Sequence, residues 1–345
     1  QRLGKDREAL DLYRQLERDA GRDDHLGRGQ LLANLGAVYR RLGDPYKALE
    51  RYKAARAEFE AARDADGRAG AWKNMGIALA VDLEDYKEAR RCFEQVLALS
   101  QGNRRETLLA TLYLAETDLR AGQRAAAHAG FEKAAELAAA IGDQEEAWRA
   151  QFGRGRAAAD ASEAQADFRA AITAIEGLRE GTRRGSARRD FLASKREVYD
   201  AYVETLSTAP PAELFEWMEK ARARDLQDTY QPRTLAETQS RLEPGETLVV
   251  TLRLESGIWL LFVTAQGAGL ERVPNAEAIG GALEKRLTEK LIVVPDRELA
   301  NLSFDALRLP GRGRYVLERS EVSYLPASAM LARRGAARVR WPWSP

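Results

Sequence analysis

Large apolar, small and aromatic residues recur at fixed spacings through the first 140 positions of the chain. In each full copy, a large residue is followed three positions later by another, and then at once by glycine or alanine. After a short polar turn, an alanine is followed four positions later by an aromatic residue. These alanines are Ala9, Ala48, Ala89 and Ala127, which lie 39, 41 and 38 residues apart. A period of this length predicts pairs of antiparallel helices stacked as a solenoid.

The pattern divides the region 1–180 into repeats of two helices. Small residues such as Gly36 and Gly76 fall where two helix backbones approach closely. Because the chain lacks an initial Met and starts within a repeat, we expect it to be a fragment of a longer protein. The expected repeats are an incomplete one at 1–20, full ones at 26–62, 66–101 and 104–140, and a weaker one at 144–179.

The periodicity changes after the repeats. Apolar residues at helical spacing predict two helices at about 186–207 and 211–230, within a helical connector of 181–231. Two runs rich in β-branched and aromatic residues follow at 248–254 and 258–264, and the short polar link between them predicts a hairpin.

The segment 232–345 as a whole predicts an α/β arrangement. A helical piece around 279–287 precedes the all-apolar run 291–294, which is typical of a strand buried on both faces of a parallel or mixed sheet. We expect further strands at 315–318 and 321–325. The predicted fold is therefore an all-α solenoid followed by an α/β domain.

Charge and cysteine content narrow the classes of function. The 54 Lys and Arg residues balance 53 Asp and Glu, so the net charge of +1 gives no overall field for nucleic acid or an anionic membrane. We expect the basic run 333–340 to be an exposed connector. No apolar run approaches the ~18 residues of a membrane span. The single cysteine, Cys92, permits no intrachain disulfide, which favours a reducing, cytoplasmic location.

The residues that metal and cofactor chemistry require are scarce. Two histidines and one cysteine provide no cluster with metal-ligand spacing. The Gly-x-Gly runs do not lie between a predicted strand and a helix, as dinucleotide binding needs. We therefore predict no metal and no cofactor.

The spacing of the helix pairs resembles the tetratricopeptide repeat in its longer variety of about 40 residues. The resemblance implies that the first helices line a concave surface where extended peptides bind. Asn34 and Asn74 lie two positions before Gly36 and Gly76, so both amides should lie on this surface. An asparagine offers a donor and an acceptor, and tetratricopeptide proteins with this signature use it to hold a ligand's backbone.

Three cations adjoin these asparagines. Lys73 precedes Asn74, and Arg40 and Arg41 lie one turn beyond Gly36, so they would add positive charge for acidic ligands. The third repeat has Tyr113 at the equivalent place, which ends the series of amides. The alternative interpretation is that all five residues are merely solvated helix positions.

Segments of the second half resemble the front part of a CHAT domain, a caspase-like cysteine peptidase family of the clan CD type found with tetratricopeptide repeats. The helix end Arg222–Leu226 and the hairpin at 248–264 also resemble the entry into that domain. The resemblance implies a Cys nucleophile activated by a His. The segments that carry it most specifically are 291–299, 302–307, 315–318 and 322–328.

In that family the catalytic pair lies on strand ends beyond the point where this sequence stops. We expect His25 in a turn, His128 on a helix surface and Cys92 as an inert thiol in a packing helix. We assign none of them to catalysis.

Two hypotheses follow. In the first, the chain is the repeat region and proximal part of a CHAT-type caspase-like protease, whose repeats bind a protein or peptide partner and regulate proteolysis. The resemblance implies a role in bacterial defence, with gasdermin-like proteins among the substrates. In the second, the chain is a non-catalytic interaction scaffold with a degenerate peptidase-like domain. A third class, a nucleic-acid binder, predicts steep salt dependence of binding. The balanced charge of this chain does not favour that class.

Overall fold

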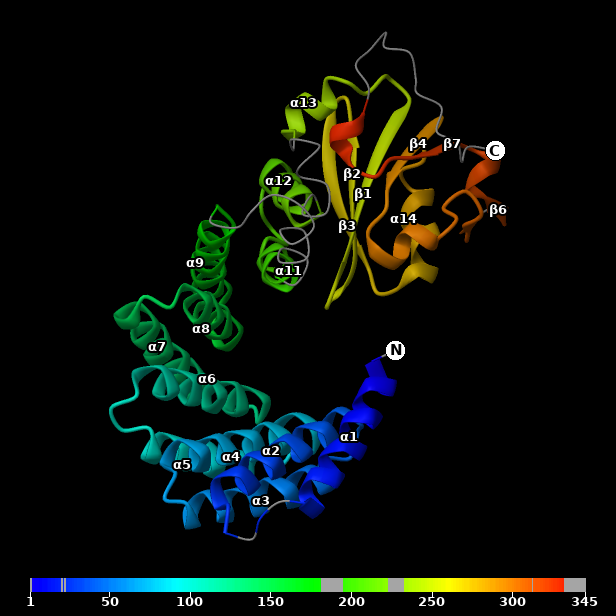
Figure 1. Ribbon diagram of the computed structural model, residues 1–345. Coiled ribbons are helices and arrows are strands. Elements are labelled where there is room, and N and C mark those ends of the chain that lie inside the picture. Colours follow the sequence, from blue (N-terminus) through cyan, green and yellow to red (C-terminus); the bar gives the residue numbers. More distant parts are fainter. Residues whose placement is uncertain are drawn as a thin grey trace. The chain divides into compact units, whose positions relative to one another are not determined.

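The computed structural model describes residues 2–19, 21, 23–180, 195–222, 233–311 and 313–331 of the 345-residue chain. The chain divides into two compact units, residues 1–178 and residues 179–345. The first unit is built of helices, and the second contains a sheet (Figure 1). The predicted order of a helical repeat region followed by a mixed α/β region is confirmed. The finer boundaries at 180 and 231 stay a prediction.

The first unit is a series of helices in which each, from α1 to α8, packs on the next one along the chain. The predicted half repeat and the repeats that follow it all appear as helices. Their bounds are α1 Arg2–Asp19, α2 His25–Arg41, α3 Pro45–Ala61, α4 Ala65–Ile77, α5 Tyr86–Leu99, α6 Arg104–Arg120, α7 Arg124–Ile141, α8 Gln144–Ala157 and α9 Ala161–Glu180.

Most of these helices begin after a side chain that can accept a hydrogen bond from the first turn. The carboxylate of Asp44, for example, accepts the backbone N–H of Lys47 at 3.1 Å. Such caps satisfy amides that have no partner within the helix and place negative charge at its positive end. The residues in this role are Asp24, Asp44, Asp64, Asp85, Asn103 and Asp143.

Glycine and aromatic residues meet where the two helices of a repeat cross. A Cβ atom on Gly36 would lie 2.5 Å from the ring of Tyr52, and one on Gly76 would lie 2.7 Å from the ring of Phe93. Both rings are almost completely buried. The repeating spacing of small and aromatic residues therefore reflects close packing of ring against backbone.

The longest step of the repeat, 41 residues between Ala48 and Ala89, contains a turn of π-helix. It covers Ala78–Asp82 and directly follows α4. A π turn holds an additional residue within a continuing helix. The π turn thus accommodates an additional residue between α4 and α5.

The second unit combines short helices with a five-stranded sheet. The predicted helices at 186–207 and 211–230 correspond to α11 and α12, and parts of both fall at 181–194 and 223–232, outside the described residues. The bounds are α11 Arg196–Thr205, α12 Pro211–Arg222, α13 Leu235–Gln239, β1 Glu246–Leu254, β2 Gly257–Thr264, β3 Gly267–Val273, α14 Ile279–Glu284, β4 Lys290–Val294, β5 Arg308–Leu309, β6 Arg314–Tyr315 and β7 Glu321–Tyr324.

The sheet has the strand order β3-β2-β1-β4-β7. Strands β1, β2 and β3 form an antiparallel meander, which contains the predicted hairpin. Strands β1, β4 and β7 run parallel, so the run 291–294 is a buried parallel strand, as expected. One face packs on α14 and the turns after β4, while α11 contacts β1 and α12 contacts β3.

Two details of the second unit differ from expectation. The strand predicted at 315–318 is confirmed only at Tyr315, the last residue of β6, because Val316–Glu318 forms a 3-10 turn whose first residue is buried in the core. Its Val316 N–H donates to the carbonyl of Leu307 at 3.0 Å rather than to a strand. Strand β3 was not predicted, since its glycines weaken the strand signal.

Candidate functional site

Asn34 and Asn74 lie on α2 and α4, two first helices that contact each other. Each precedes by two positions the glycine that packs on an aromatic ring of the second helix. Both side chains are half-buried, and neither amide has a hydrogen-bonding partner among the residues that the structure describes. A half-buried amide with unused donors and acceptors can pair with the backbone of a bound segment.

The three predicted cations all have partners on neighbouring helices. Arg40 pairs with Asp82 of the π turn. Arg41 Nε lies 2.8 Å from Asp6 Oδ1 of α1, and Lys73 Nζ lies 3.0 Å from Glu106 Oε2 of α6. These pairs neutralise the cations and connect successive repeats. An acidic ligand would therefore compete with carboxylates that are already in place.

The third repeat replaces the amide by a stacked ring. Tyr113 of α6 stacks on Phe93 of α5, with ring centroids 5.4 Å apart and planes inclined by 11°. Offset stacking of this kind fixes an aromatic side chain in the packing between helices. The pair of amides is therefore confined to α2 and α4.

Neither histidine is positioned to activate the thiol. His25 Nδ1 lies 2.8 Å from Glu58 Oε2, and this contact, more than the nearby Arg28, lowers the pKa of Glu58. His128 Nε2 lies 3.1 Å from Glu163 Oε1. Cys92 lies in a buried cluster with Leu35, Tyr39 and other apolar residues. Both histidines thus pair with carboxylates, and the thiol lies among apolar side chains.

Burial makes the Cys92 thiol inert. Desolvation raises its pKa to about 12, so the thiol stays neutral in the folded chain. We expect iodoacetamide to leave native Cys92 unmodified at pH 8 and to alkylate it after unfolding, as mass spectrometry would show. The contribution of this group to stability is complete below the pKa of an unfolded thiol, about 8.5, and is lost as the pH rises toward 12. Rapid alkylation of the native chain would contradict this assignment.

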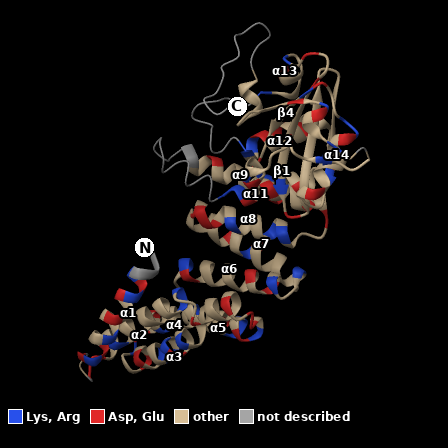
Figure 2. Cartoon of the chain, turned by 90° about the vertical axis from the view of Figure 1, so that its right-hand side faces the viewer, with Lys and Arg blue, Asp and Glu red and all other residues tan. Residues whose placement is uncertain are grey.

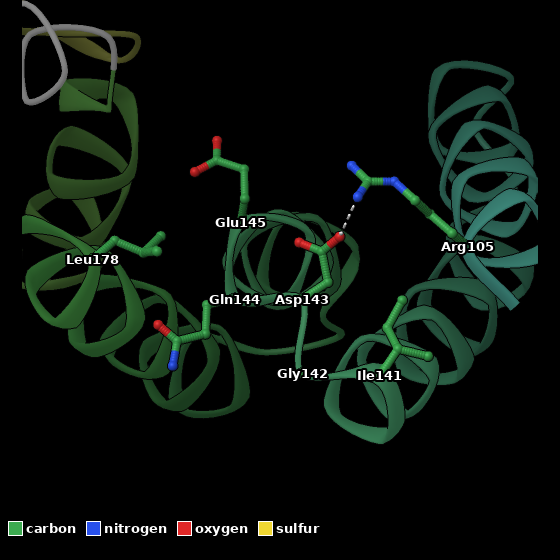
Figure 3. A pocket seen from close by; sticks show the side chains of 7 residues that line it. All are labelled: Arg105, Ile141, Gly142, Asp143, Gln144, Glu145 and Leu178. Carbon is green, nitrogen blue, oxygen red and sulfur yellow. Dashed lines mark ion pairs between the residues drawn. The ribbon is translucent and has the colours of Figure 1, made fainter. Parts of the chain in front are cut away.

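Sequence analysis missed an open pocket of about 460 Å³ in the first unit. It is lined by residues of α6, α8 and α9, by Ile141 at the end of α7 and by the turn that follows it (Figure 3). Arg105 and Asp143 face each other across it, with Nη1 and Oδ2 3.7 Å apart. Asp143 also caps α8, so the facing pair of Arg105 and Asp143 is already engaged. None of the predicted site residues lies in it.

Sequence analysis also missed an ion-pair cluster where β4 ends. Arg196 of α11 donates to Asp296, with Nη2 and Oδ1 2.7 Å apart. Asp200, one turn further along α11, pairs with Arg297. Desolvation raises the pKa of Asp200 despite these cations. Nothing in the local sequence signals this cluster, because its members lie about 100 positions apart.

The described residues lack the features of three other kinds of site. In the described part of the chain, no three His, Cys, Asp or Glu side chains come together as metal ligands would. No described helix combines the length and apolar character that crossing a bilayer requires. Basic and acidic side chains alternate along the helices instead of forming one continuous field (Figure 2).

Comparison with known proteins places the repeats in context. The tetratricopeptide repeat family matches residues 27–102. The sequence matches no curated protein. The crystal structure of BtubC (BKLC) from P. vanneervenii is similar at 17% identity and a TM-score of 0.50, covering 67% of this chain and 92% of that one.

Two further structures match with TM-scores below 0.5. Aspartyl phosphate phosphatase F from Bacillus subtilis has 15% identity and a TM-score of 0.49, covering 63% of this chain and 56% of that one. A putative kinesin light chain of Podosopora anserina has 20% identity and a TM-score of 0.40, covering 51% of this chain and 87% of that one. The similarity to BtubC, at 17% identity, concerns the fold alone. The chain therefore contains tetratricopeptide repeats, and repeats of this kind imply binding of a peptide or protein.

Proposed function

We propose that the repeat unit binds an extended segment of a protein partner along its first helices, with Asn34 and Asn74 holding the backbone of that segment. The observation that carries this proposal is the pair of half-buried amides at equivalent places on two adjacent helices, with no partner among the described residues. Each amide can donate to a ligand carbonyl and accept from a ligand N–H. Such pairing is independent of the ligand's side chains.

The ion pairs refine which partners are expected. Arg40, Arg41 and Lys73 would have to leave Asp82, Asp6 and Glu106 before they could bind a ligand carboxylate. Partly exposed pairs of this kind contribute little net energy, so exchange of one carboxylate for another gains little. We propose that these cations hold the wall of the groove and that the amides recognise the ligand.

The double variant Asn34→Ala, Asn74→Ala tests this assignment. Twelve-residue peptides selected from a random library against the full chain serve as ligands. We expect their Kd, measured by fluorescence anisotropy, to rise by about tenfold to a hundredfold, because each amide loses up to two hydrogen bonds. The helical circular dichroism should not change.

Gln95→Ala provides the matched control. Gln95 is an exposed amide on the second helix α5, so its removal should leave Kd unchanged. Equal affinity of the double variant and the native chain would refute the groove assignment. A loss of affinity in Gln95→Ala would place the binding surface on the second helices instead.

We further propose that the α/β unit is the proximal part of a CHAT-type caspase-like protease, and that partner binding by the repeats regulates proteolysis. The residues at 291–328 support this proposal by their resemblance to that family. The buried parallel strand β4 between β1 and β7 is compatible with it. A bacterial-defence role with a gasdermin-like substrate is part of the same proposal.

A non-catalytic scaffold is the second candidate, and one observation favours it. The two histidines and the only cysteine of this chain are engaged in contacts within the repeat unit. His25 and His128 lie beside carboxylates, and Cys92 is buried. The reading frame beyond codon 345 separates the two candidates. A His and a Cys that each follow a predicted strand would support the protease, and their absence would support the scaffold.

A further inference from the structure

Strand β1 extends beyond its parallel neighbour β4 at their carboxyl ends. Val294, the last residue of β4, pairs with Val250, whereas β1 continues to Leu254. The backbone groups of β1 past this point have no strand beside them on the β4 side. Buried backbone groups nevertheless require partners. Side chains from outside the sheet supply them here.

One buried guanidinium satisfies the carbonyl groups at this edge. Arg222, at the end of α12, is only 8% exposed. Its Nη1 donates to the carbonyls of Thr251 at 3.0 Å and Val294 at 2.6 Å. Its Nη2 donates to those of Pro295 at 2.8 Å and Pro326 at 3.3 Å. A single side chain thus connects β1, the end of β4 and the segment after β7.

The same helix holds the segment after β7 by a second contact. Glu219, one turn before Arg222, accepts a hydrogen bond from the hydroxyl of Ser328. Both side chains are almost completely buried. Desolvation lowers the pKa of the Arg222 guanidinium, and the nearby Glu219 carboxyl group partly offsets this shift. Helix α12 therefore binds the edge through the guanidinium of Arg222 and the carboxyl group of Glu219.

Helix α11 binds the remaining groups of the edge. Its Arg196 holds Asp296, and Asp296 Oδ2 accepts the otherwise unpaired N–H of Arg253 at 3.1 Å. Glu204, near the other end of α11, accepts the N–H of Ser256 in the β1–β2 turn at 2.7 Å. Both ends of the helix are thus fixed to the carboxyl ends of the strands.

We propose that α11 and α12 act as a clamp on the carboxyl edge of the parallel strands, with Arg222 as its central positioning residue. In open α/β sheets, ligands bind outside this edge, so the clamp controls the segments that would form such a site. The two helices come between the repeats and the sheet in the chain. The coupling of the clamp to the repeats rests on the proposed function: binding of a partner by the repeats alters the edge through α11 and α12.

Hydrogen exchange of the full chain tests the clamp without any ligand. Arg222→Met keeps much of the side-chain volume but removes a donor from four carbonyl groups, of which Val294 keeps the hydroxyl of Thr251 at 3.4 Å. We expect amides at 294–299 and 322–331 to exchange about tenfold faster or more, and amides of α2 to α7 to be unchanged. Arg222→Lys retains a cation that reaches fewer carbonyls, so its increase should be smaller.

Arg253→Met is the matched control at the same edge. Its side chain is partly exposed and makes a 3.7 Å contact with Glu298, while its backbone N–H remains available to Asp296. This variant should leave exchange at the edge unchanged. Unchanged exchange in Arg222→Met, or an equal increase throughout β1, β2 and β3, would refute a positioning role for Arg222.

A second measurement tests the coupling to the repeats. A library-selected peptide that binds the repeats should change exchange at 294–299 in the native chain by about threefold or more. In Arg222→Met this response should be lost while the peptide's Kd stays the same. Binding without any response at the edge would refute the coupling alone. Failure to select any peptide would instead count against the proposed function.

Discussion

Replacing Gly76 with leucine is expected to lower the free energy of unfolding of the repeat unit by roughly 3 kcal/mol, the upper part of the range for an overpacked core. Even a Cβ atom at this position would lie 2.7 Å from two ring atoms of Phe93. That ring is 1% exposed and stacks on Tyr113, so it has no free space to move into. Native-state hydrogen exchange of amides in α4 and α5 measures the loss.

Gly70 provides the control within the same helix. A Cβ atom there would meet nothing within 4 Å, so Gly70→Ala adds no clash. Alanine also favours a helix over glycine by up to about 1 kcal/mol, so we expect this variant to be as stable as the native chain or slightly more so. If Gly76→Leu were as stable as Gly70→Ala, close packing of Phe93 on the backbone would not explain the repeating glycine.

The contrast between these two glycines shows why the repeat region could be predicted from sequence. The position of Gly76 recurs as Gly36 one repeat earlier, because every repeat solves the same packing problem between two helices. Gly70 has no such counterpart and no such constraint. Periodicity of small and aromatic residues therefore determined the helix pairs, whereas the π turn at Ala78–Asp82 was visible only as a longer step between repeats.

The candidate binding site stays a prediction, and repetition accounts only for the equivalence of its two amides. Asn34 and Asn74 occupy equivalent positions, two residues before the packing glycines of α2 and α4, and these two helices contact each other. The partners of the cations were not predictable. Arg40 and Asp82 belong to different repeats, and Lys73 and Glu106 are 33 positions apart. No local pattern connects such residues, because the contacts form only once the repeats have stacked.

In the α/β unit, sequence predicted most strands of the sheet but not the buried contacts that hold its edge. Continuous apolar runs identified β1, β2 and β4, since strands buried on both faces need them. Strand β3 is partly exposed and begins Gly-Ala-Gly, so only its pairing with β2 defines it. The role of Arg222 could not be foreseen, because its acceptors are backbone carbonyls, which every residue has.

The second large effect is expected at Asp296. Removing its carboxylate by Asp296→Ala should lower the free energy of unfolding of the α/β unit by about 3–5 kcal/mol, the usual cost of breaking a buried ion pair from one side. Asp296 is 3% exposed, and the side chain of Arg196 is 13% exposed. The variant leaves Arg196 with Asp200 alone, which Arg297 already engages, and leaves the N–H of Arg253 without its acceptor.

Glu298→Ala tests whether the loss of stability in Asp296→Ala comes from the buried position of the carboxylate or from its charge alone. Glu298 is also acidic and lies two positions further on, but its side chain is 63% exposed and its nearest cation, Arg253, is 3.7 Å away. An exposed pair contributes about 0–1 kcal/mol, so this variant should scarcely differ from the native chain. Native-state hydrogen exchange of β1 and β2 amides reports both values. If the two variants lost the same stability, the junction of α11 with β4 would depend on surface charge, and the buried contact of Arg196 with Asp296 would not hold it together.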